Sequence, residues 1–306
     1  MRRVVATLGL SVALFWLAPS AATTSAPARL VAQAPAAQAA ARVELPNREG
    51  SLKFAVLGDF GTGKREQYEL GTQMAKCRER FPFELVITVG DNLYGSQRPK
   101  DFEKKFELPY KGLLDANVKF YASLGNHDER EGQRYYQRFN MDGKLYYTFK
   151  APKQSVRFFA LDSTYADPAQ SAWLEKELQG SREDWNIPYF HHPLYSSGQR
   201  HGSTPTLRAV WEPLFVKYGV SVVFAGHDHF YERTTPQKDI VHFVTGSGGQ
   251  LRKGNINRRS GFTASGFDTD RAFLVAEIDR DELYFNVISR AGTVVDSGVI
   301  QRRKQP

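Results

Sequence analysis

The feature that most constrains the fold of this chain is a series of short apolar runs, each ending at a glycine or a polar turn. Segments of mixed charge with helical character lie between the runs. This order is typical of βαβ units, in which helices cover a largely parallel sheet. We therefore predict an α/β core with strands at 52–57, 84–89, 118–123, 145–149, 156–161, 187–190, 220–225 and 240–245, and helices at 169–179 and 206–218.

The rest of the chain after residue 46 extends this core without a visible break. Residues 271–300 predict a meander of three strands that turns at 279–281 and 291–292. The composition, with 13% aromatic residues, excludes disorder over most of the length. The single cysteine, Cys77, can form neither an internal disulfide nor a thiolate zinc cage. We predict one domain over 47–306.

The N-terminus has the pattern of an export signal. Arg2 and Arg3 precede an apolar run over 4–18, which Pro19 and small residues follow. We predict a signal peptide over 1–22, although a membrane anchor is the alternative. Spanning a bilayer takes ~20 apolar residues, which favours cleavage and a secreted or periplasmic location. Residues 23–46, rich in Ala and Pro, predict a flexible spacer.

Polar turns follow the predicted strands in a recurring pattern. In open α/β sheets the carboxyl ends of the strands form the ligand-binding edge, so these turns are expected to meet there. Their side chains combine carboxylate, amide and imidazole groups, which together suit metal ions. The turns are Gly58-Asp59-Phe60-Gly61, Gly90-Asp91-Asn92-Leu93-Tyr94, Gly125-Asn126-His127-Asp128, His191-His192-Pro193 and Gly226-His227-Asp228-His229.

This ordered motif series resembles that of the calcineurin-like metallophosphoesterases over about Leu52 to Gly249. Tyr94, three residues after Asp91, makes the chain similar to the small, single-domain purple acid phosphatases, the tartrate-resistant acid phosphatase-like form. The resemblance implies an αββα fold, in which helices flank a two-sheet β-sandwich. It also implies a dinuclear metal site at the carboxyl ends of the strands, and that 47–306 is the catalytic domain.

The resemblance implies a ligand set for each of two metal ions. In the family the tyrosine phenolate binds Fe(III), and the partner ion is divalent Fe, Zn or Mn. The metal histidine stands two residues before a proline, which selects His191 and leaves His192 a neutral packing role. With Asp91 as the bridge, one ion takes Asp59, Asp91, Tyr94 and His229, and the other takes Asp91, Asn126, His191 and His227.

Further side chains are expected around the metals. The resemblance implies that His127 points towards bound phosphate, and that His201 contacts phosphate or protonates the leaving group. Arg200 replaces the Glu or His common in the family, and a cation there favours substrates that carry phosphate. Asp128 and Asp228, beside predicted ligands, are expected to orient imidazoles. The cations of the 252–259 segment suggest a solvated loop or anion steering.

The implied function is that of an exported phosphatase, which hydrolyses phosphate monoesters by attack of a metal-bound hydroxide. A phosphodiesterase or nucleotidase of the same superfamily is the alternative. A second alternative is a nucleic-acid- or phosphate-binding protein with a relict site, given the net charge of +8. The chain lacks interleaved aromatic and basic repeats, so we expect a small phosphorylated substrate rather than nucleic acid. We expect no stable membrane insertion after signal cleavage.

Overall fold

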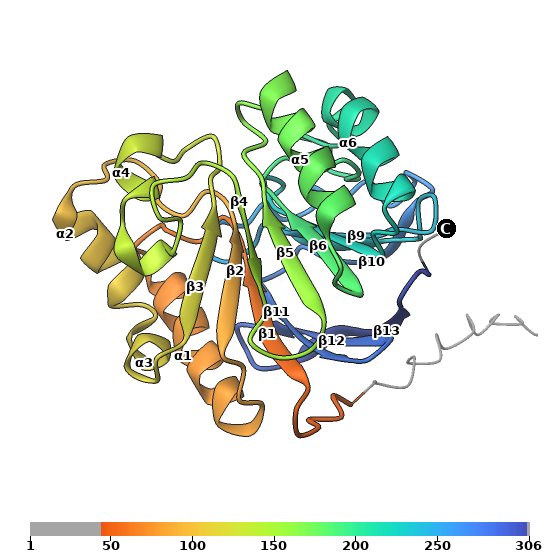
Figure 1. Ribbon diagram of the computed structural model, residues 1–306. Helices are drawn as coiled ribbons and strands as arrows, with labels where there is room; N and C mark the ends of the chain where they lie inside the picture. Colours follow the sequence, from red (N-terminus) through yellow and green to blue (C-terminus); the bar gives the residue numbers. More distant parts are fainter. Residues whose placement is uncertain (1–43, 305–306) are drawn as a thin grey trace, which may run out of the picture. The chain divides into compact units, whose positions relative to one another are not determined.

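The computed structural model describes residues 44–304, whose strands form two mixed sheets that pack face to face (Figure 1). The six-stranded sheet has the order β13 (Val294–Gln301), β12 (Glu282–Ser289), β11 (Ala272–Asp279), β1 (Leu52–Leu57), β2 (Leu85–Val89), β3 (Lys119–Ser123). The seven-stranded sheet has the order β10 (Thr263–Phe267), β8 (Tyr231–Thr234), β9 (Val241–Thr245), β7 (Val222–Ala225), β6 (Trp185–Tyr189), β5 (Val156–Ala160), β4 (Tyr147–Lys150). The predicted signal peptide and most of the predicted spacer lie outside the described residues.

Helices cover the outer faces of both sheets (Figure 1). On the six-stranded sheet, α1 packs beside α3, and on the seven-stranded sheet α5 packs beside α6. The helices are α1 (Arg65–Arg80), α2 (Pro99–Phe102), the π-helical turn η1 (Glu103–Glu107), α3 (Lys111–Asp115), α4 (Arg130–Arg134), the 3₁₀ turn η2 (Gln137–Phe139), α5 (Pro168–Gly180) and α6 (Pro205–Lys217). Within residues 44–304, none of these is long and apolar enough to cross a membrane.

Aromatic side chains fill the space between the two sheets. The Phe54 ring of β1 makes edge contacts with Phe158 of β5 and Phe224 of β7, at centroid distances of 5.3 and 6.1 Å. Successive side chains of a strand point to opposite faces, so Phe158 joins this inner core while Phe159 packs under α5 and α6. Each strand of the sheet interior is therefore apolar on both faces, as the continuous apolar runs predicted.

The predicted fold class is confirmed: two sheets flanked by helices form the αββα arrangement. The predicted strands and the C-terminal meander are present, with ends that differ by a few residues. Two strands were not predicted, β8 and β10. Their sequences, YERT and TASGF, lack an apolar run, and they become strands by pairing with β9 and with each other.

The topology brings the carboxyl ends of strands from both sheets to one edge. β1, β2 and β3 are parallel neighbours, and so are β5, β6, β7 and β9 in the other sheet. Backbone hydrogen bonds join the turns within each sheet, from the Asp59 N–H to the Gly90 oxygen (3.0 Å) and from the Gly226 N–H to the His191 oxygen (2.9 Å). The polar turns predicted from the sequence therefore meet at this edge.

Candidate metal centre

Three of the predicted ligands have a left-handed backbone conformation. The φ angles of Asp59, Asp91 and His227 are 54°, 51° and 70°. For residues other than glycine this conformation costs roughly 1–2 kcal/mol. A glycine precedes each of them, and at Gly226 a Cβ atom would lie only 2.5 Å from the Asp59 Oδ2 atom. Strained backbone conformations and closely packed glycines thus direct the side chains of Asp59, Asp91 and His227 towards one another.

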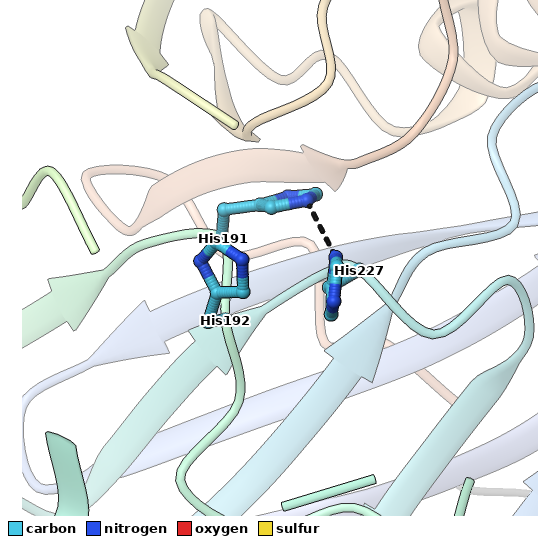
Figure 2. A group of neighbouring side chains, drawn as sticks. All are labelled: His191, His192 and His227. Carbon is cyan, nitrogen blue, oxygen red and sulfur yellow. Dashed lines mark hydrogen bonds between the residues drawn. The ribbon is translucent and has the colours of Figure 1, made fainter. Parts of the chain in front are cut away.

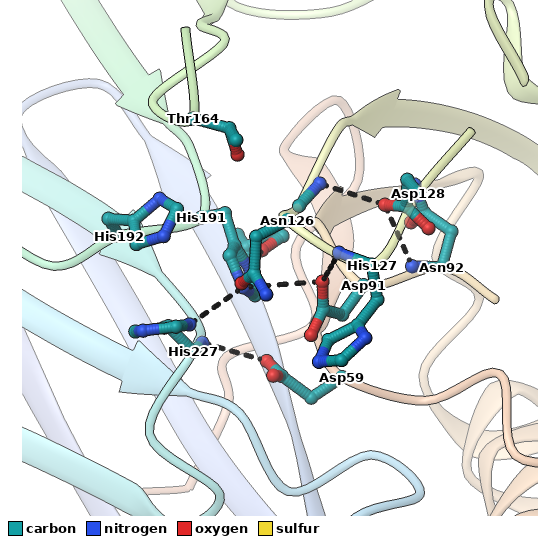
Figure 3. A network of polar contacts seen from close by, with 12 residues as sticks. Asp59, Asp91, Asn92, Asn126, His127, Asp128, Thr164, His191, His192 and His227 are labelled. Carbon is teal, nitrogen blue, oxygen red and sulfur yellow. Dashed lines mark hydrogen bonds and ion pairs between the residues drawn. The ribbon is translucent and has the colours of Figure 1, made fainter. Parts of the chain in front are cut away.

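The Nε2 atom of the His191 ring faces other atoms that can bind a metal ion (Figure 2, Figure 3). Its Nδ1–H donates to the Val89 carbonyl oxygen at 2.9 Å, so in the neutral ring Nε2 carries no proton. Burial lowers the pKa of His191 well below its usual value, which keeps the ring neutral. Nε2 lies 3.1 Å from Asn126 Oδ1, 3.1 Å from His227 Nδ1 and 3.4 Å from Asp91 Oδ1. Electron-pair donors therefore converge here around His191.

A second group of possible metal-ligand atoms surrounds the Asp59 carboxylate. Asp59 Oδ1 accepts the Tyr94 hydroxyl at 3.1 Å and lies 3.4 Å from His229 Nε2. The Tyr94 oxygen is 3.3 Å from the same nitrogen. The other oxygen, Oδ2, accepts the backbone N–H of His227 at 2.9 Å, which ties the six-stranded sheet to the seven-stranded one. The ligand atoms of Asp59, Asp91 and His229 all lie within 4.8 Å of one another.

These donors fit a pair of metal ions on electrostatic grounds. Burial raises the pKa of Asp59 well above its usual value, and the charge of Asp91 raises it further. Burial also raises the pKa of Asp91, and it lowers that of His229 to about 4. A bound cation would lower the pKa of the two carboxyl groups, because it stabilises carboxylates, and it would bind the neutral imidazoles as well. Asp91 approaches both convergences, as a bridging ligand requires.

His192 lies next to His191 and His227 (Figure 2). Its Nδ1 atom is 3.0 Å from the Ser163 hydroxyl, and its ring centroid is 4.3 Å from that of His227. Burial lowers the pKa of His192 to about 4, so the ring is neutral. Its free nitrogen falls within 4.8 Å of ligand atoms of His191 and His227. His191 remains the predicted ligand, because its nitrogen faces Asn126 and Asp91 as well.

Asp128 has a different role from the one predicted. Its buried carboxylate lies beside Asn92 (Figure 3) and accepts the backbone N–H groups of Asn92, Leu93 and Gly125 at 3.1, 3.0 and 2.8 Å. It also accepts the side-chain amide of Gln133 at 2.6 Å. Within residues 44–304 these bonds go to amide groups, so the prediction that Asp128 orients an imidazole is wrong. Burial, and then the charge of Asp91, raise its pKa to about 7. Asp128 fixes the two turns that follow β2 and β3.

Asp228 likewise orients a loop rather than an imidazole. Its buried carboxylate accepts the Ser196 hydroxyl at 2.5 Å and the Gly202 N–H at 3.0 Å. A Cβ atom on Gly198 would lie 2.2 Å from Asp228 Oδ2, so only glycine permits this approach. The loop between Ser196 and Gly202 carries Arg200 and His201, and Asp228 therefore determines where those side chains stand.

The structure brings both predicted catalytic histidines to the solvent-exposed rim of the site. The His127 ring lies 4.9 Å from the Tyr94 ring, and the His201 ring lies 4.1 Å from the His227 ring, measured between centroids. Arg200, next to His201, is exposed. His127 and His201 thus lie beside proposed metal ligands, and Arg200 is in the same exposed loop as His201.

Two residues at the site were missed by the sequence reasoning. The Thr164 hydroxyl is buried, has no hydrogen-bond partner within the described chain and faces the gap between Asn126 and His192 (Figure 3). Thr164 follows β5 just as the predicted ligands follow their strands, and that position was the available signal. The other is Arg252, whose backbone N–H donates to the His229 oxygen at 2.9 Å. Only its membership of a basic run was visible in the sequence.

Comparison with known proteins assigns the chain to a family. The model of the calcineurin-like phosphoesterase family matches residues 52–231. The chain belongs to this family. Tartrate-resistant acid phosphatase type 5 of Homo sapiens is 24% identical over 84% of this chain and 93% of its own length. Fe(3+)-Zn(2+) purple acid phosphatase 12 of Arabidopsis thaliana is 38% identical over 62% of this chain, which spans 45% of that relative.

Two solved structures share this fold. The purple acid phosphatase of yellow lupin seeds (Lupinus luteus) superposes with a TM-score of 0.65 at 19% identity, over 85% of this chain and 55% of that one. GAP50, described as the anchor in the inner membrane complex of Plasmodium, superposes with a TM-score of 0.73 at 19% identity, over 83% and 90%. Family and relatives together identify a metallophosphatase with a dinuclear site, a hydrolase of phosphoric esters.

Replacing Asp91 by Asn tests whether this carboxylate bridges both ions. The substitution keeps the volume, and Asn tolerates the left-handed conformation, so the fold should persist. Because one charge serves both ions, we expect metal affinity to fall at least about tenfold at both positions. Elemental analysis of the purified Asp91→Asn and wild-type chains measures this, with the exposed Asp115→Asn as the control. A variant that keeps the full metal content of the wild type refutes the bridge.

Proposed function

We propose that the protein is an exported phosphatase that hydrolyses small phosphate monoesters. One observation supports this above the others: the buried side chains of Asp59, Asp91 and His191 converge with the more accessible amide and imidazole groups of Asn126, His227 and His229, while exposed imidazoles stand at the rim. The proposed metal ligands are Asp59, Asp91, Tyr94, Asn126, His191, His227 and His229, and the proposed substrate contacts are His127, Arg200 and His201.

The surroundings of Tyr94 favour a trivalent ion beside it. Burial raises the pKa of the Tyr94 hydroxyl well above its usual value, and the Asp59 and Asp91 charges raise it further. Only a strongly polarising cation compensates for a phenolate in such surroundings, so we propose Fe(III) there with divalent Fe, Zn or Mn as its partner. When bound, such a pair activates a water molecule and stabilises the oxygens of the transferring phosphoryl group.

The side chains of the rim have separate proposed roles. His127 is held by its backbone N–H, which donates to Asp91 Oδ1 at 3.0 Å, and its exposed ring binds a phosphate oxygen. His201 donates a proton to the leaving-group oxygen, or binds phosphate, from a loop that Asp228 fixes. Arg200, a permanent cation in that loop, attracts the anionic ester.

Export is proposed from the N-terminal sequence. The charged start and apolar run over residues 1–22 have the pattern of a cleaved signal, which directs the chain to a secreted or periplasmic location. The partner we propose is a small phosphorylated molecule, with neither nucleic acid binding nor stable membrane insertion after cleavage.

Rates on a monoester and a diester test the proposed activity. We expect kcat/KM for 4-nitrophenyl phosphate to exceed that for bis(4-nitrophenyl) phosphate at least about tenfold, a barrier difference of ~1.4 kcal/mol. A reversed preference supports the phosphodiesterase alternative. Hydrolysis of neither ester, joined with salt-dependent DNA binding, supports a binding protein with a relict site.

The substitution Tyr94→Phe tests the proposed Fe(III)–phenolate pair. It removes one oxygen and little volume, so the packing should persist, whereas a long-wavelength visible band should disappear. Visible spectra of the iron-loaded wild-type and Tyr94→Phe proteins measure this, with the exposed Tyr135→Phe as the matched control. If the band survives in Tyr94→Phe, Tyr94 is not the chromophoric ligand.

The substitution His201→Ala tests the proton-donor role. Loss of a general acid should lower kcat by ~10² to 10⁴ for an alkyl phosphate, and much less for a nitrophenyl phosphate, whose leaving group needs no proton. Metal content should stay unchanged, because His201 is not among the proposed ligands. Equal losses on both esters indicate phosphate binding only, and no loss on either contradicts any role for His201 in the reaction.

A further inference from the structure

Among residues 44–304, no acid forms an ion pair with Arg252. Its Nη1 atom is buried and has no hydrogen-bond partner within residues 44–304. In that part of the chain no ion pair joins Arg252 to a carboxylate, whereas Arg258 of the same basic run pairs with Asp268 at 3.5 Å. A desolvated guanidinium nitrogen without a partner is costly, which indicates that an anion completes its contacts.

The backbone places Arg252 between a proposed metal ligand and the loop of His201. The Arg252 N–H donates to the His229 oxygen at 2.9 Å. A few residues on, the Gln199 N–H donates to the Asn255 oxygen and the Asn257 N–H donates to the Ser197 oxygen, both at 2.9 Å. The segment from Arg252 to Asn257 therefore runs from one wall of the site to the loop that bears Arg200 and His201.

The Arg252 charge acts on the site itself. Burial is the main cause that lowers the pKa of His229, and the Arg252 guanidinium is the next. Burial also lowers the pKa of His201, which the Asp228 carboxylate opposes and the Arg252 guanidinium reinforces. The same positive field therefore reaches the exposed rim, where the leaving group is expected beside His201.

The surrounding contacts fix the backbone of the His201 loop and of the segment after Arg252. Asp228 binds the Ser196 hydroxyl and the Gly202 N–H, and it also accepts the Asn255 side-chain amide at 3.5 Å. The buried carboxylate thus joins the His201 loop to the segment that follows Arg252. Because these contacts exist before substrate arrives, little ordering entropy opposes binding of an anion at this rim.

We propose that Arg252, together with Arg200, forms a cationic subsite for a second anionic group on the substrate. The substrate class is phosphate esters whose leaving group carries a carboxylate or another phosphate. The phosphoryl group itself lies over the metal ligands, and the second anion approaches the partly exposed side chain of Arg252. The catalytic consequence rests on the proposed function, whereas the binding of the second anion does not.

Binding of two matched phosphonates to the metal-loaded protein tests the subsite. 3-Phosphonopropionate and propylphosphonate share the head group, but only the first carries a carboxylate. We expect calorimetry to show that the wild type binds 3-phosphonopropionate about tenfold more tightly than propylphosphonate. Arg252→Gln should remove this preference, while the exposed Lys253→Gln, an equal loss of charge, should keep it.

Each other outcome overturns the subsite. If the wild type shows no preference, no second anion is recognised. If Arg252→Gln weakens both phosphonates equally, Arg252 binds the phosphoryl group, and if Lys253→Gln behaves like Arg252→Gln, only the general field matters. Circular dichroism and metal content of the variants confirm that fold and loading are unchanged.

A kinetic comparison separates this proposal from the proposed function. We expect Arg252→Gln to lower kcat/KM for 3-phosphoglycerate about tenfold relative to glycerol 3-phosphate. Equal losses on both esters overturn the subsite and leave the phosphatase proposal standing. Absence of hydrolysis by the wild type overturns the phosphatase proposal, and the calorimetry still decides whether Arg252 binds the second anion.

Discussion

The buried carboxylates of Asp59 and Asp91 impose the constraint on which the rest of the site depends. Burial raises the pKa of both, and the approaching imidazoles of His191 and His229 are neutral for the same reason. The two carboxylate charges therefore repel each other, and the neutral imidazoles do not offset them. Metal ions relieve this repulsion, so the strained turns that create it are explained by metal binding rather than by stability.

A second pair of buried acids, Asp128 and Asp228, organises the surroundings. Each accepts hydrogen bonds from backbone N–H groups of turns that carry functional side chains. Orientation of the His191 imidazole comes instead from the Val89 carbonyl oxygen. Acids next to metal ligands in the sequence thus form hydrogen bonds with the backbone of the turns, and not with the imidazoles.

The cationic side chains near the site differ in how far they are exposed to solvent. Arg252 is half-buried and lacks a partner among the described residues, whereas Arg200 and Lys253 are exposed. Solvent screens exposed charges strongly, so the half-buried one contributes most to anion binding. Substrate selection can therefore depend on a residue that contributes nothing to the proposed metal coordination.

The sequence by itself determined the family, the α/β fold and the turns that meet at the metal centre, because strand periodicity and motif order are local properties. The sequence did not predict strands β8 and β10, because their sequences lack an apolar run and they form only by pairing with neighbouring strands. Tertiary structure alone decided the roles of Asp128, Asp228 and Arg252. Those roles depend on which distant backbone groups and charges the fold brings within hydrogen-bond range, and sequence spacing carries no information about that.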